Sequence, residues 1–298
     1  MRFQTIATSH GRLAFEDSGG RGTALLLIHG NSSCRRVFAR QCESQLRDSR
    51  RLIAFDLPGH GESEDAADPA RTYTRSGLAD AAVELTGLLG LMEVVVLGWS
   101  LGGHVAIEML SRLEGLKGIL ITGTPPVRRG AMEEGFLASP HLASAGRKDL
   151  SPPEMRAFAG AIFGEPVEPF LLQAIARADG RCRERLFQAA QAGHGVDQRL
   201  AVEASPVPIA VINGAADPLI KLDYVESVAF RKLWSGRSHR LDGGHAPFWH
   251  AAADFNALLE RFLADVSSGA TRHRGPAPAR PSMPGLPDHP HVFAGSTT

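Results

Sequence analysis

Continuous apolar runs of strand length, separated by helical patterns, set the strongest limit on how this chain can fold. Helical patterns at 77–91 and 102–113 lie between such runs. Strands that are covered on both faces have continuous apolar runs, whereas half-exposed strands alternate apolar and polar residues. Strands alternating with helices form βαβ crossovers, which predicts an α/β fold with a mostly parallel central sheet flanked by helices. The runs fall at residues 24–28, 51–55, 94–97, 118–121 and 207–212.

One long region interrupts this alternation. No convincing strand occurs from 124 to 205, where helical patterns at 152–162 and 168–178 carry most of the apolar residues. We interpret this region as a helical cap, inserted before the last two strands of the sheet. Residues 1–123 and 206–266 then form the α/β core.

The two ends of the chain differ from the core. Segment 2–16 has the pattern of an antiparallel hairpin at the sheet edge. Residues 267–298 are rich in Ser, Gly, Pro, Ala and Arg and poor in large apolar residues. Such a composition buries too little apolar surface to offset the entropy of ordering, so we expect a disordered C-terminal tail.

Charge and cysteine content narrow the possible partners. The chain has 32 basic and 32 acidic side chains, which argues against nucleic acid or an anionic membrane as the main partner. It has no apolar window of about 18 residues and no apolar leader at its start. Three cysteines without metal-type spacing fit a reduced, cytoplasmic protein without a metal or cofactor. No obligate protein partner is evident.

A serine between glycines follows the third apolar run. Gly98, Ser100 and Gly102 lie between that run and a helical pattern, which is the arrangement of a nucleophile elbow. The sharp turn brings the flanking residues so close together that a Cβ atom on either would clash. It also lifts the serine hydroxyl above the sheet edge, at a helix N-terminus that favours negative charge. The alternative is an ordinary strand–helix turn with a capping serine; the context favours the nucleophile.

A serine nucleophile needs a base, and His245 is the best placed of the 12 histidines. It lies in a glycine-rich loop after a short run at 238–241, and loops at carboxyl strand ends carry the reactive groups of α/β sheets. His104 lies one helical turn after Ser100. We expect it to pack, because the nearby helix N-terminus disfavours its protonated form.

The base needs an acid that orients it, and Asp217 follows the strand-like run 207–212. The chain order Ser100, Asp217, His245 is the order found in the nucleophile-elbow fold. Asp223 and Asp242 are alternatives. Asp223 falls inside the next helical pattern, and Asp242 is too near His245 in sequence to approach its ring easily.

Two backbone N–H groups are the candidates for an oxyanion hole. One belongs to Leu101, the residue after the nucleophile, and the other to Asn31 in the loop after the first apolar run. His29 is expected to hold that loop by hydrogen bonds, and Asp56 to form a tight turn without a chemical role. Candidate substrate-binding residues, some of which could equally be cap core, are Asn31, Trp99, Phe136, Phe158, Phe163 and Phe170.

Together these residues resemble the α/β-hydrolase fold family over roughly residues 2–266. Within it, the chain is most similar to the metal-independent N-acyl homoserine lactonases, which are quorum-quenching enzymes. Members of that group can carry Glu at the acid position, where this chain has Asp217. The cap, which sets substrate choice, is where the similarity weakens. The stretches that carry the resemblance are "IHGNSS", "DLPGHGESEDAADPARTY", "GWSLGGHVAIEML", "LITGTPPV", "ADGR" and "GGHAPF".

The resemblance implies a serine hydrolase that opens the lactone ring of N-acyl homoserine lactones with Ser100, His245 and Asp217. A broad carboxylesterase would use the same residues, and sequence does not separate the two. A cofactor-free perhydrolase side reaction would also use this triad. Dehalogenase and ordinary epoxide-hydrolase chemistry need a carboxylate at position 100. A lactone-binding receptor of this fold is a third alternative, for which the sequence gives no positive sign.

Overall fold

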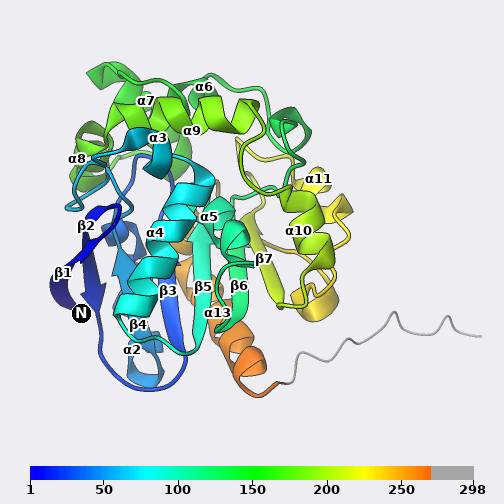
Figure 1. Ribbon diagram of the computed structural model, residues 1–298. Helices are drawn as coiled ribbons and strands as arrows, with labels where there is room; N and C mark the ends of the chain where they lie inside the picture. Colours follow the sequence, from blue (N-terminus) through cyan, green and yellow to red (C-terminus); the bar gives the residue numbers. More distant parts are fainter. Residues whose placement is uncertain (270–298) are drawn as a thin grey trace, which may run out of the picture.

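A computed structural model describes residues 1–269, which form one eight-stranded sheet with helices on both faces (Figure 1). The strand order is β1-β2-β4-β3-β5-β6-β7-β8. Each predicted apolar run lies within a strand or overlaps one. The strands are β1 Arg2–Thr8, β2 Gly11–Asp17, β3 Ala24–Ile28, β4 Arg51–Phe55, β5 Val94–Trp99, β6 Leu116–Thr122, β7 Ile209–Gly214 and β8 His239–Leu241.

The sheet is parallel from β4 to β8 and antiparallel at one edge. Strands β1 and β2 form a hairpin, and β2 pairs antiparallel with β4. All the other neighbours pair in parallel. The predicted α/β architecture is therefore confirmed, with the expected hairpin at the edge. Because the central strands are parallel, the loops after β3, β5, β6, β7 and β8 leave the same edge of the sheet.

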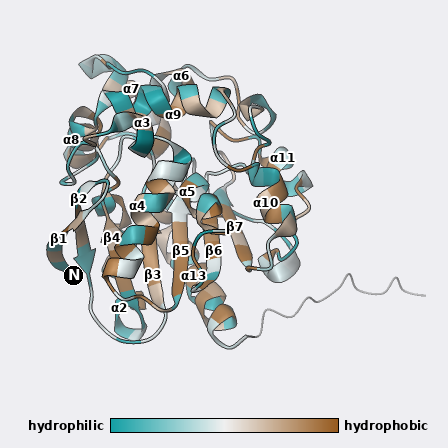
Figure 2. Ribbon diagram, in the orientation of Figure 1, coloured by the Kyte–Doolittle hydropathy of each residue, from teal (hydrophilic) through white to brown (hydrophobic). Residues whose placement is uncertain are grey.

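Two apolar layers hold the helices against the sheet, because successive side chains of a strand point to opposite faces. In β3, Leu26 and Ile28 pack into one layer, while Leu25 and Leu27 pack into the other. Helices α4 (Arg75–Leu88) and α5 (Leu101–Met109) cover the first face, and α13 (Ala252–Ser267) covers the second. The strands between these layers are largely hydrophobic (Figure 2).

Five helices lie between β6 and β7 in the chain; α6, α7, α8 and α9 lie over the carboxyl ends of the strands, whereas α10 lies beside the sheet, near α11 (Figure 1). Two of them, α7 and α8, match the predicted patterns closely. The other three were not predicted individually; α9 in particular is rich in arginine and glutamine, which hides its apolar face. We propose that residues 124–205 act as the cap. The five helices are α6 Pro140–Ala145, α7 Pro152–Phe163, α8 Pro169–Arg177, α9 Gly180–Gln191 and α10 Gln198–Ala204.

Short elements complete the described part of the chain. Helix α13 extends through Ser267, and the rest of the predicted tail, residues 270–298, lies outside the described residues. None of the described helices is long and apolar enough to cross a membrane. The short elements are η1 Arg35–Phe38, α1 Ala39–Cys42, α2 Leu46–Ser49, α3 Pro69–Thr72, η2 Met132–Glu134, α11 Leu222–Ser227, η3 Trp234–Gly236 and α12 Pro247–His250.

Candidate active site

Ser100 lies on a strained turn between β5 and α5. Its backbone has φ 53° and ψ −116°, a conformation that L-residues rarely adopt and that costs on the order of 1–3 kcal/mol. A Cβ atom on Gly98 would lie 2.3 Å from the carbonyl oxygen of Gly102, and one on Gly102 would lie 2.0 Å from that of Ile28. Both glycines are therefore required by close backbone approach. The turn has the geometry of a nucleophile elbow.

Asp217 and His245 form a buried pair. His245 Nδ1 lies 2.8 Å from Asp217 Oδ2 and 3.1 Å from Oδ1. The Asp217 Oδ1 atom also accepts hydrogen bonds from the backbone N–H groups of Leu219 and Ile220, at 2.9 Å and 3.2 Å. These contacts fix the carboxylate, which in turn can fix the ring orientation and keep the Nδ1 proton on the side of Asp217.

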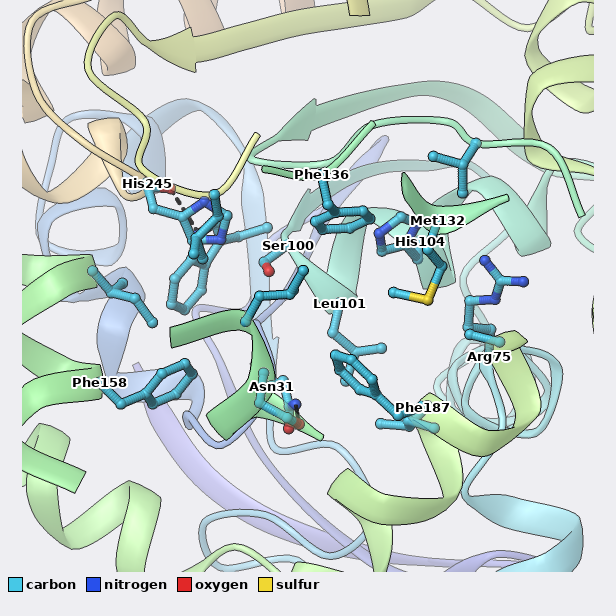
Figure 3. Close-up of a pocket in the computed structure, with 18 residues that line it drawn as sticks. Asn31, Arg75, Ser100, Leu101, His104, Met132, Phe136, Phe158, Phe187 and His245 are labelled. Carbon is cyan, nitrogen blue, oxygen red and sulfur yellow. Dashed lines mark hydrogen bonds between the residues drawn. The ribbon is translucent and has the colours of Figure 1, made fainter. Parts of the chain in front are cut away.

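The His245 ring faces the cavity that Ser100 lines (Figure 3). Trp99 Nε1 donates a 2.9 Å hydrogen bond to the His245 carbonyl oxygen, and a Cβ atom on Gly123 would lie 2.7 Å from His245 Cε1. Within residues 1–269 no hydrogen bond joins Ser100 Oγ to His245. Such bonds are often long without substrate and shorten when it binds. The hydroxyl and the imidazole therefore line the same cavity, as a nucleophile and its base would.

The alternative acids lie elsewhere. Asp223 is almost fully exposed, in α11, where it forms an ion pair with Arg240. Asp242 is exposed in the loop before His245, and the carboxylate beside the His245 ring belongs to Asp217. Of the three candidates, only Asp217 contacts the ring in the structure.

The loop after β3 approaches the serine from the other side. A Cβ atom on Gly30 would lie 2.9 Å from Trp99 Cε3 and 3.2 Å from Ser100 Cβ, so the loop packs directly on the elbow. The N–H groups of Asn31 and Leu101 donate no hydrogen bond to another described residue. Two unused N–H donors next to the nucleophile can stabilise an oxyanion. The Asn31 side chain lines the cavity, and its Nδ2 donates to the Ala145 carbonyl oxygen at 2.7 Å.

Two neutral histidines hold this loop. His29 donates from Nδ1 to the Gly30 carbonyl oxygen at 2.7 Å, and its Nε2 accepts from the Leu57 N–H at 3.0 Å. The expected structural role of His29 is therefore confirmed. His60 Nε2 accepts from the Ser32 N–H at 3.1 Å. Burial lowers the pKa of His29 to about 4 and that of His60 to about 3, so each ring keeps an acceptor nitrogen.

An arginine of the cap also contacts this loop. Arg183 in α9 is buried, and its Nη1 donates to Ser32 Oγ at 3.2 Å. Its Nε and Nη2 donate to the carbonyl oxygens of Arg147 and Lys148 at 2.8 Å and 2.7 Å. Ser32 itself has a left-handed backbone, with φ 56°, next to Asn31. Arg183 thus links the cap to the loop that carries one of the oxyanion donors.

The "ADGR" stretch is part of the same junction between cap and core. Asp179, at the start of α9, accepts a 2.6 Å hydrogen bond from the Tyr73 hydroxyl and donates its N–H to the Gly59 carbonyl oxygen at 2.8 Å. Asp56, which begins the "DLPGHGES" stretch, is buried in an ion pair with Arg35 and accepts hydrogen bonds from the backbone N–H groups of Arg35 and Glu62. Both stretches serve structure here, and neither carboxylate lines the cavity.

The cavity wall is largely apolar and comes from both core and cap. Trp99, Phe136 and Phe158 line it, in the positions that the sequence suggested for substrate contacts. Phe163 and Phe170 do not contribute to this wall. The Phe163 ring packs between Trp99 and Trp249, at 5.4 Å and 5.9 Å between ring centres, and therefore lies behind the wall. Phe170 lies against Arg36 and Trp249.

Two polar residues of the wall were not anticipated. His104, expected to pack, is buried and hydrogen-bonded to Gln198 at 2.6 Å, but it also lines the cavity. Arg75, at the start of α4, lines the cavity as well. Arg75 lies two residues before the predicted helical pattern at 77–91, which therefore gave no indication that it would face the site. Its Nη2 donates to the carbonyl oxygen of His194, in the cap, at 2.9 Å.

The cysteines and other potential metal ligands form no second reactive site in the described part of the chain. Cys34, Cys42 and Cys182 are free thiols, and all three are buried. Burial raises the pKa of Cys34 to about 11 and that of Cys42 to about 12, which disfavours the thiolate. Within the described part of the chain, no group of three or more His, Cys, Asp or Glu side chains could hold a metal ion.

This combination of a parallel sheet, a strained serine on a strand–helix turn and a buried histidine–aspartate pair defines a protein of the α/β-hydrolase class. Residues 25–258 match the family model described as "Alpha/beta hydrolase family". The chain belongs to this family.

Solved structures and sequence relatives refine the comparison. The structure is similar to that of a serine-to-glycine mutant of the N-acyl homoserine lactonase AidH in complex with N-hexanoyl homoserine lactone. The TM-score is 0.88 at 45% sequence identity, covering 90% of this chain and 99% of that chain. The AidH complex with N-butanoyl homoserine gives a TM-score of 0.87 at 46% identity, covering 90% and 98%. The similarity to N-acyl homoserine lactonases predicted from sequence is therefore confirmed.

A second group of relatives consists of methyl ester esterases. The pimeloyl-[acyl-carrier protein] methyl ester esterase of Stenotrophomonas maltophilia (strain R551-3) is 29% identical over 276 residues, which cover 83% of this chain and 95% of the relative. The esterase of Methylococcus capsulatus (strain ATCC 33009 / NCIMB 11132 / Bath) is 27% identical over 263 residues, covering 84% and 98%. Both groups are hydrolases of carboxylic esters by name.

Proposed function

We propose that this protein is a serine hydrolase that opens the lactone ring of N-acyl homoserine lactones, releasing N-acyl homoserine. The observation that carries the proposal is the 45% identity to the lactonase AidH over 90% of this chain, at a TM-score of 0.88. The mainly apolar cavity beside Ser100 and His245 supports it, since the acyl chain of such a lactone is apolar.

The first half of the reaction uses Ser100 as nucleophile and His245 as base. Ser100 Oγ attacks the lactone carbonyl carbon while His245 Nε2 takes the hydroxyl proton. The N–H groups of Asn31 and Leu101 stabilise the oxyanion of the tetrahedral intermediate. The ring C–O bond then breaks, and His245 returns the proton to the departing alkoxide. Asp217 keeps the imidazole in the tautomer that can accept at Nε2 and stabilises its protonated form.

The second half releases the product. The alcohol formed by ring opening stays attached to the acyl group, so water must intercept the acyl-enzyme before the ring closes again. His245 takes a proton from that water, which attacks the ester carbonyl carbon. Collapse of the second intermediate breaks the bond to Ser100, and His245 reprotonates the serine. The net change is the addition of one water molecule to the lactone.

Mass spectrometry of the purified protein with a hexanoyl to dodecanoyl series of N-acyl homoserine lactones tests this proposal. We expect gain of one water, unchanged by added chelator and lost in Ser100→Ala. Ser144→Ala, which removes a half-buried cap serine whose hydroxyl donates only to the Pro140 carbonyl oxygen, is the matched control and is expected to keep wild-type turnover. Turnover by Ser100→Ala at the wild-type rate would contradict the mechanism.

A second candidate is a carboxylesterase that acts on methyl or other simple esters. The 29% identity to a methyl ester esterase over 83% of this chain favours it. The same nucleophile, base and acid would serve, because the cap rather than the triad selects the substrate. Comparing kcat/KM for hexanoyl homoserine lactone and for methyl hexanoate separates the two. A higher value for the simple ester would move the protein to the esterases.

A further inference from the structure

Arg75 is a buried cation in the wall of an otherwise mostly apolar cavity. The residue is 8% exposed, and its side chain lines the same cavity as Ser100 and His245. One of its guanidinium nitrogens, Nη2, donates to the His194 carbonyl oxygen at 2.9 Å. No carboxylate forms an ion pair with it among the described residues. Four of its five N–H donors therefore have no protein partner in residues 1–269.

No carboxylate in the described residues contacts this cation directly. Burial lowers the pKa of Arg75, the nearby Glu108 opposes that change, and Arg129 adds to it. Glu108, however, already accepts hydrogen bonds from Arg112, Ser76 and the Val196 N–H. No Asp or Glu belongs to the described residues that line the cavity. A guanidinium stays protonated in proteins, so the cavity carries a net positive charge.

His104 gives the same end of the cavity a hydrogen-bond acceptor. Gln198 Nε2 donates to the His104 carbonyl oxygen at 3.0 Å, so the Gln198 Oε1 atom must be the acceptor that His104 Nδ1 meets at 2.6 Å. His104 therefore holds its proton on Nδ1. Burial lowers its pKa to about 3, which leaves Nε2 with a free lone pair. The polar end thus consists of one charged donor and one neutral acceptor.

The polar end lies on the acyl side of the nucleophile. In Figure 3, His245 lies on one side of Ser100, while His104, Met132 and Arg75 lie on the other. The leaving oxygen must face His245 to receive its proton, so the acyl part of the substrate points away from His245. His104 is one helical turn beyond Ser100, about 6 Å along the axis of α5. The far part of a short acyl chain can therefore reach this end of the cavity.

We propose that Arg75 selects acyl chains that end in a carboxylate, so that monoesters of dicarboxylic acids are a further substrate class of this site. The inference rests on the proposed function, because it takes Ser100 as the atom that attacks the acyl group. The chemistry is the same: Ser100 replaces the alcohol, which leaves with the proton from His245, and water then releases the diacid. A carboxylate pairs with the planar guanidinium through two parallel hydrogen bonds.

The free-energy cost of placing an uncharged alkyl chain beside Arg75 supports the proposal that this residue selects a carboxylate. A plain alkyl chain that fills the polar end displaces water from Arg75 and leaves a buried charge without a partner, which is unfavourable. A carboxylate in the same place restores the lost hydrogen bonds. Short alkyl chains that end before Arg75 avoid the penalty. The wall therefore discriminates by the chemistry of the chain end as well as by its length.

The test compares kcat/KM for monomethyl adipate and for methyl hexanoate, which have acyl chains of equal carbon number, in wild type and in Arg75→Met. We expect the ratio of the two values to fall about 10- to 150-fold in the variant, since hydrogen bonds to charged groups contribute about 1.5–3 kcal/mol. Arg75→Lys keeps the charge and is expected to retain part of the preference. Arg156→Met, which removes an exposed arginine of α7, is expected to leave the ratio unchanged.

A binding measurement separates this inference from the proposed function. Calorimetry of monomethyl adipate with Ser100→Ala needs no turnover, and binding should weaken when Arg75→Met is added. If the protein does not open homoserine lactones but still prefers monomethyl adipate in a way that depends on Arg75, the lactonase proposal fails. The proposal that Arg75 selects carboxylate-ended chains then stands. If the ratio of kcat/KM for monomethyl adipate to that for methyl hexanoate is unchanged in Arg75→Met, the proposed role of Arg75 is wrong. A stronger preference for methyl 5-oxohexanoate than for monomethyl adipate would overturn the carboxylate assignment.

Discussion

Asp217 and His245 are 28 residues apart in the chain, and their side chains meet at 2.8 Å between Asp217 Oδ2 and His245 Nδ1. The Asp217 Oδ1 atom is held by two backbone N–H groups of its own loop. The carboxylate is therefore fixed before any substrate arrives. Because the carboxylate is held in place, replacing it with an amide should change its hydrogen bond to His245 without moving it.

Asp217→Asn should lower kcat about ten-thousandfold. The Asn oxygen can still accept from the Leu219 and Ile220 N–H groups, which turns the amide NH₂ toward His245 Nδ1. The ring would then carry its proton on Nε2 and could not accept one from Ser100. Steady-state kinetics measures the effect, with circular dichroism to check folding. Asp223→Asn removes the exposed rival carboxylate and should leave kcat unchanged; equal losses in both variants would contradict the assignment.

The sequence was sufficient for the sheet because each central strand is a continuous apolar run. The runs at 24–28 and 51–55 coincide with β3 and β4. The carboxyl ends of parallel strands meet at one edge, so the grouping of Ser100, Asp217 and His245 could be predicted from their positions directly after strands and from their chain order. The same reasoning located the loop of Asn31.

The cavity wall could not be predicted in the same way, because it depends on how the cap packs. His104 and Gln198 are 94 residues apart and belong to different layers, and no local pattern relates them. Phe163 and Phe158 lie five residues apart in α7, yet only Phe158 faces the cavity, while Trp249 covers Phe163. Amphipathic patterns identify the apolar side of a helix, but they do not distinguish a core from a pocket.

Gly98→Ala should destabilise the protein, because its Cβ atom would lie 2.3 Å from a backbone oxygen that cannot move independently. We expect a loss of about 1–3 kcal/mol in the free energy of unfolding, with loss of activity as the elbow shifts. Gly87→Ala, in α4 with nothing within 4 Å of the added Cβ, should instead stabilise by about 0.5–1 kcal/mol. Urea unfolding measures both. Equal effects would show that the elbow imposes no special constraint.

Acid should unfold the protein through its buried histidines. The pKa values of His29, His60 and His104 are lowered by burial to about 4, 3 and 3, from 6.5. Between these values and 6.5 the unfolded chain binds more protons than the folded one. The stability that the neutral rings contribute is complete above about pH 6.5 and is lost as the pH falls, by up to about 1.4 kcal/mol per pH unit for each histidine.

Urea unfolding between about pH 8 and pH 5 checks this dependence. His60→Gln keeps one donor and one acceptor but cannot titrate, so its free energy of unfolding should fall less steeply with acidification than that of wild type. The number of protons taken up on unfolding should be smaller in His60→Gln than in wild type, by close to one proton per molecule below about pH 6. Parallel curves for wild type and His60→Gln would contradict a neutral, buried His60.

Arg183 should couple the cap to the oxyanion loop. Its Nη1 contacts Ser32 Oγ at 3.2 Å, while its other donors hold two carbonyl oxygens of the cap. Without the guanidinium, Ser32 loses a partner that supports its left-handed backbone, and the neighbouring Asn31 N–H shifts from the oxyanion position. We expect Arg183→Met to lower kcat about tenfold, less than the full loss of an oxyanion donor, with a smaller change in KM.

The measurement needs a readout that loss of stability alone would not produce. Kinetics well below the unfolding midpoint compares Arg183→Met with Arg185→Met, an exposed arginine of the same helix. Binding of an oxyanion mimic such as a boronic acid should weaken in Arg183→Met and stay unchanged in Arg185→Met, because only the former displaces a donor. If Arg183→Met unfolds more easily but keeps wild-type kcat and boronate affinity, then Arg183 anchors the cap without positioning the oxyanion loop.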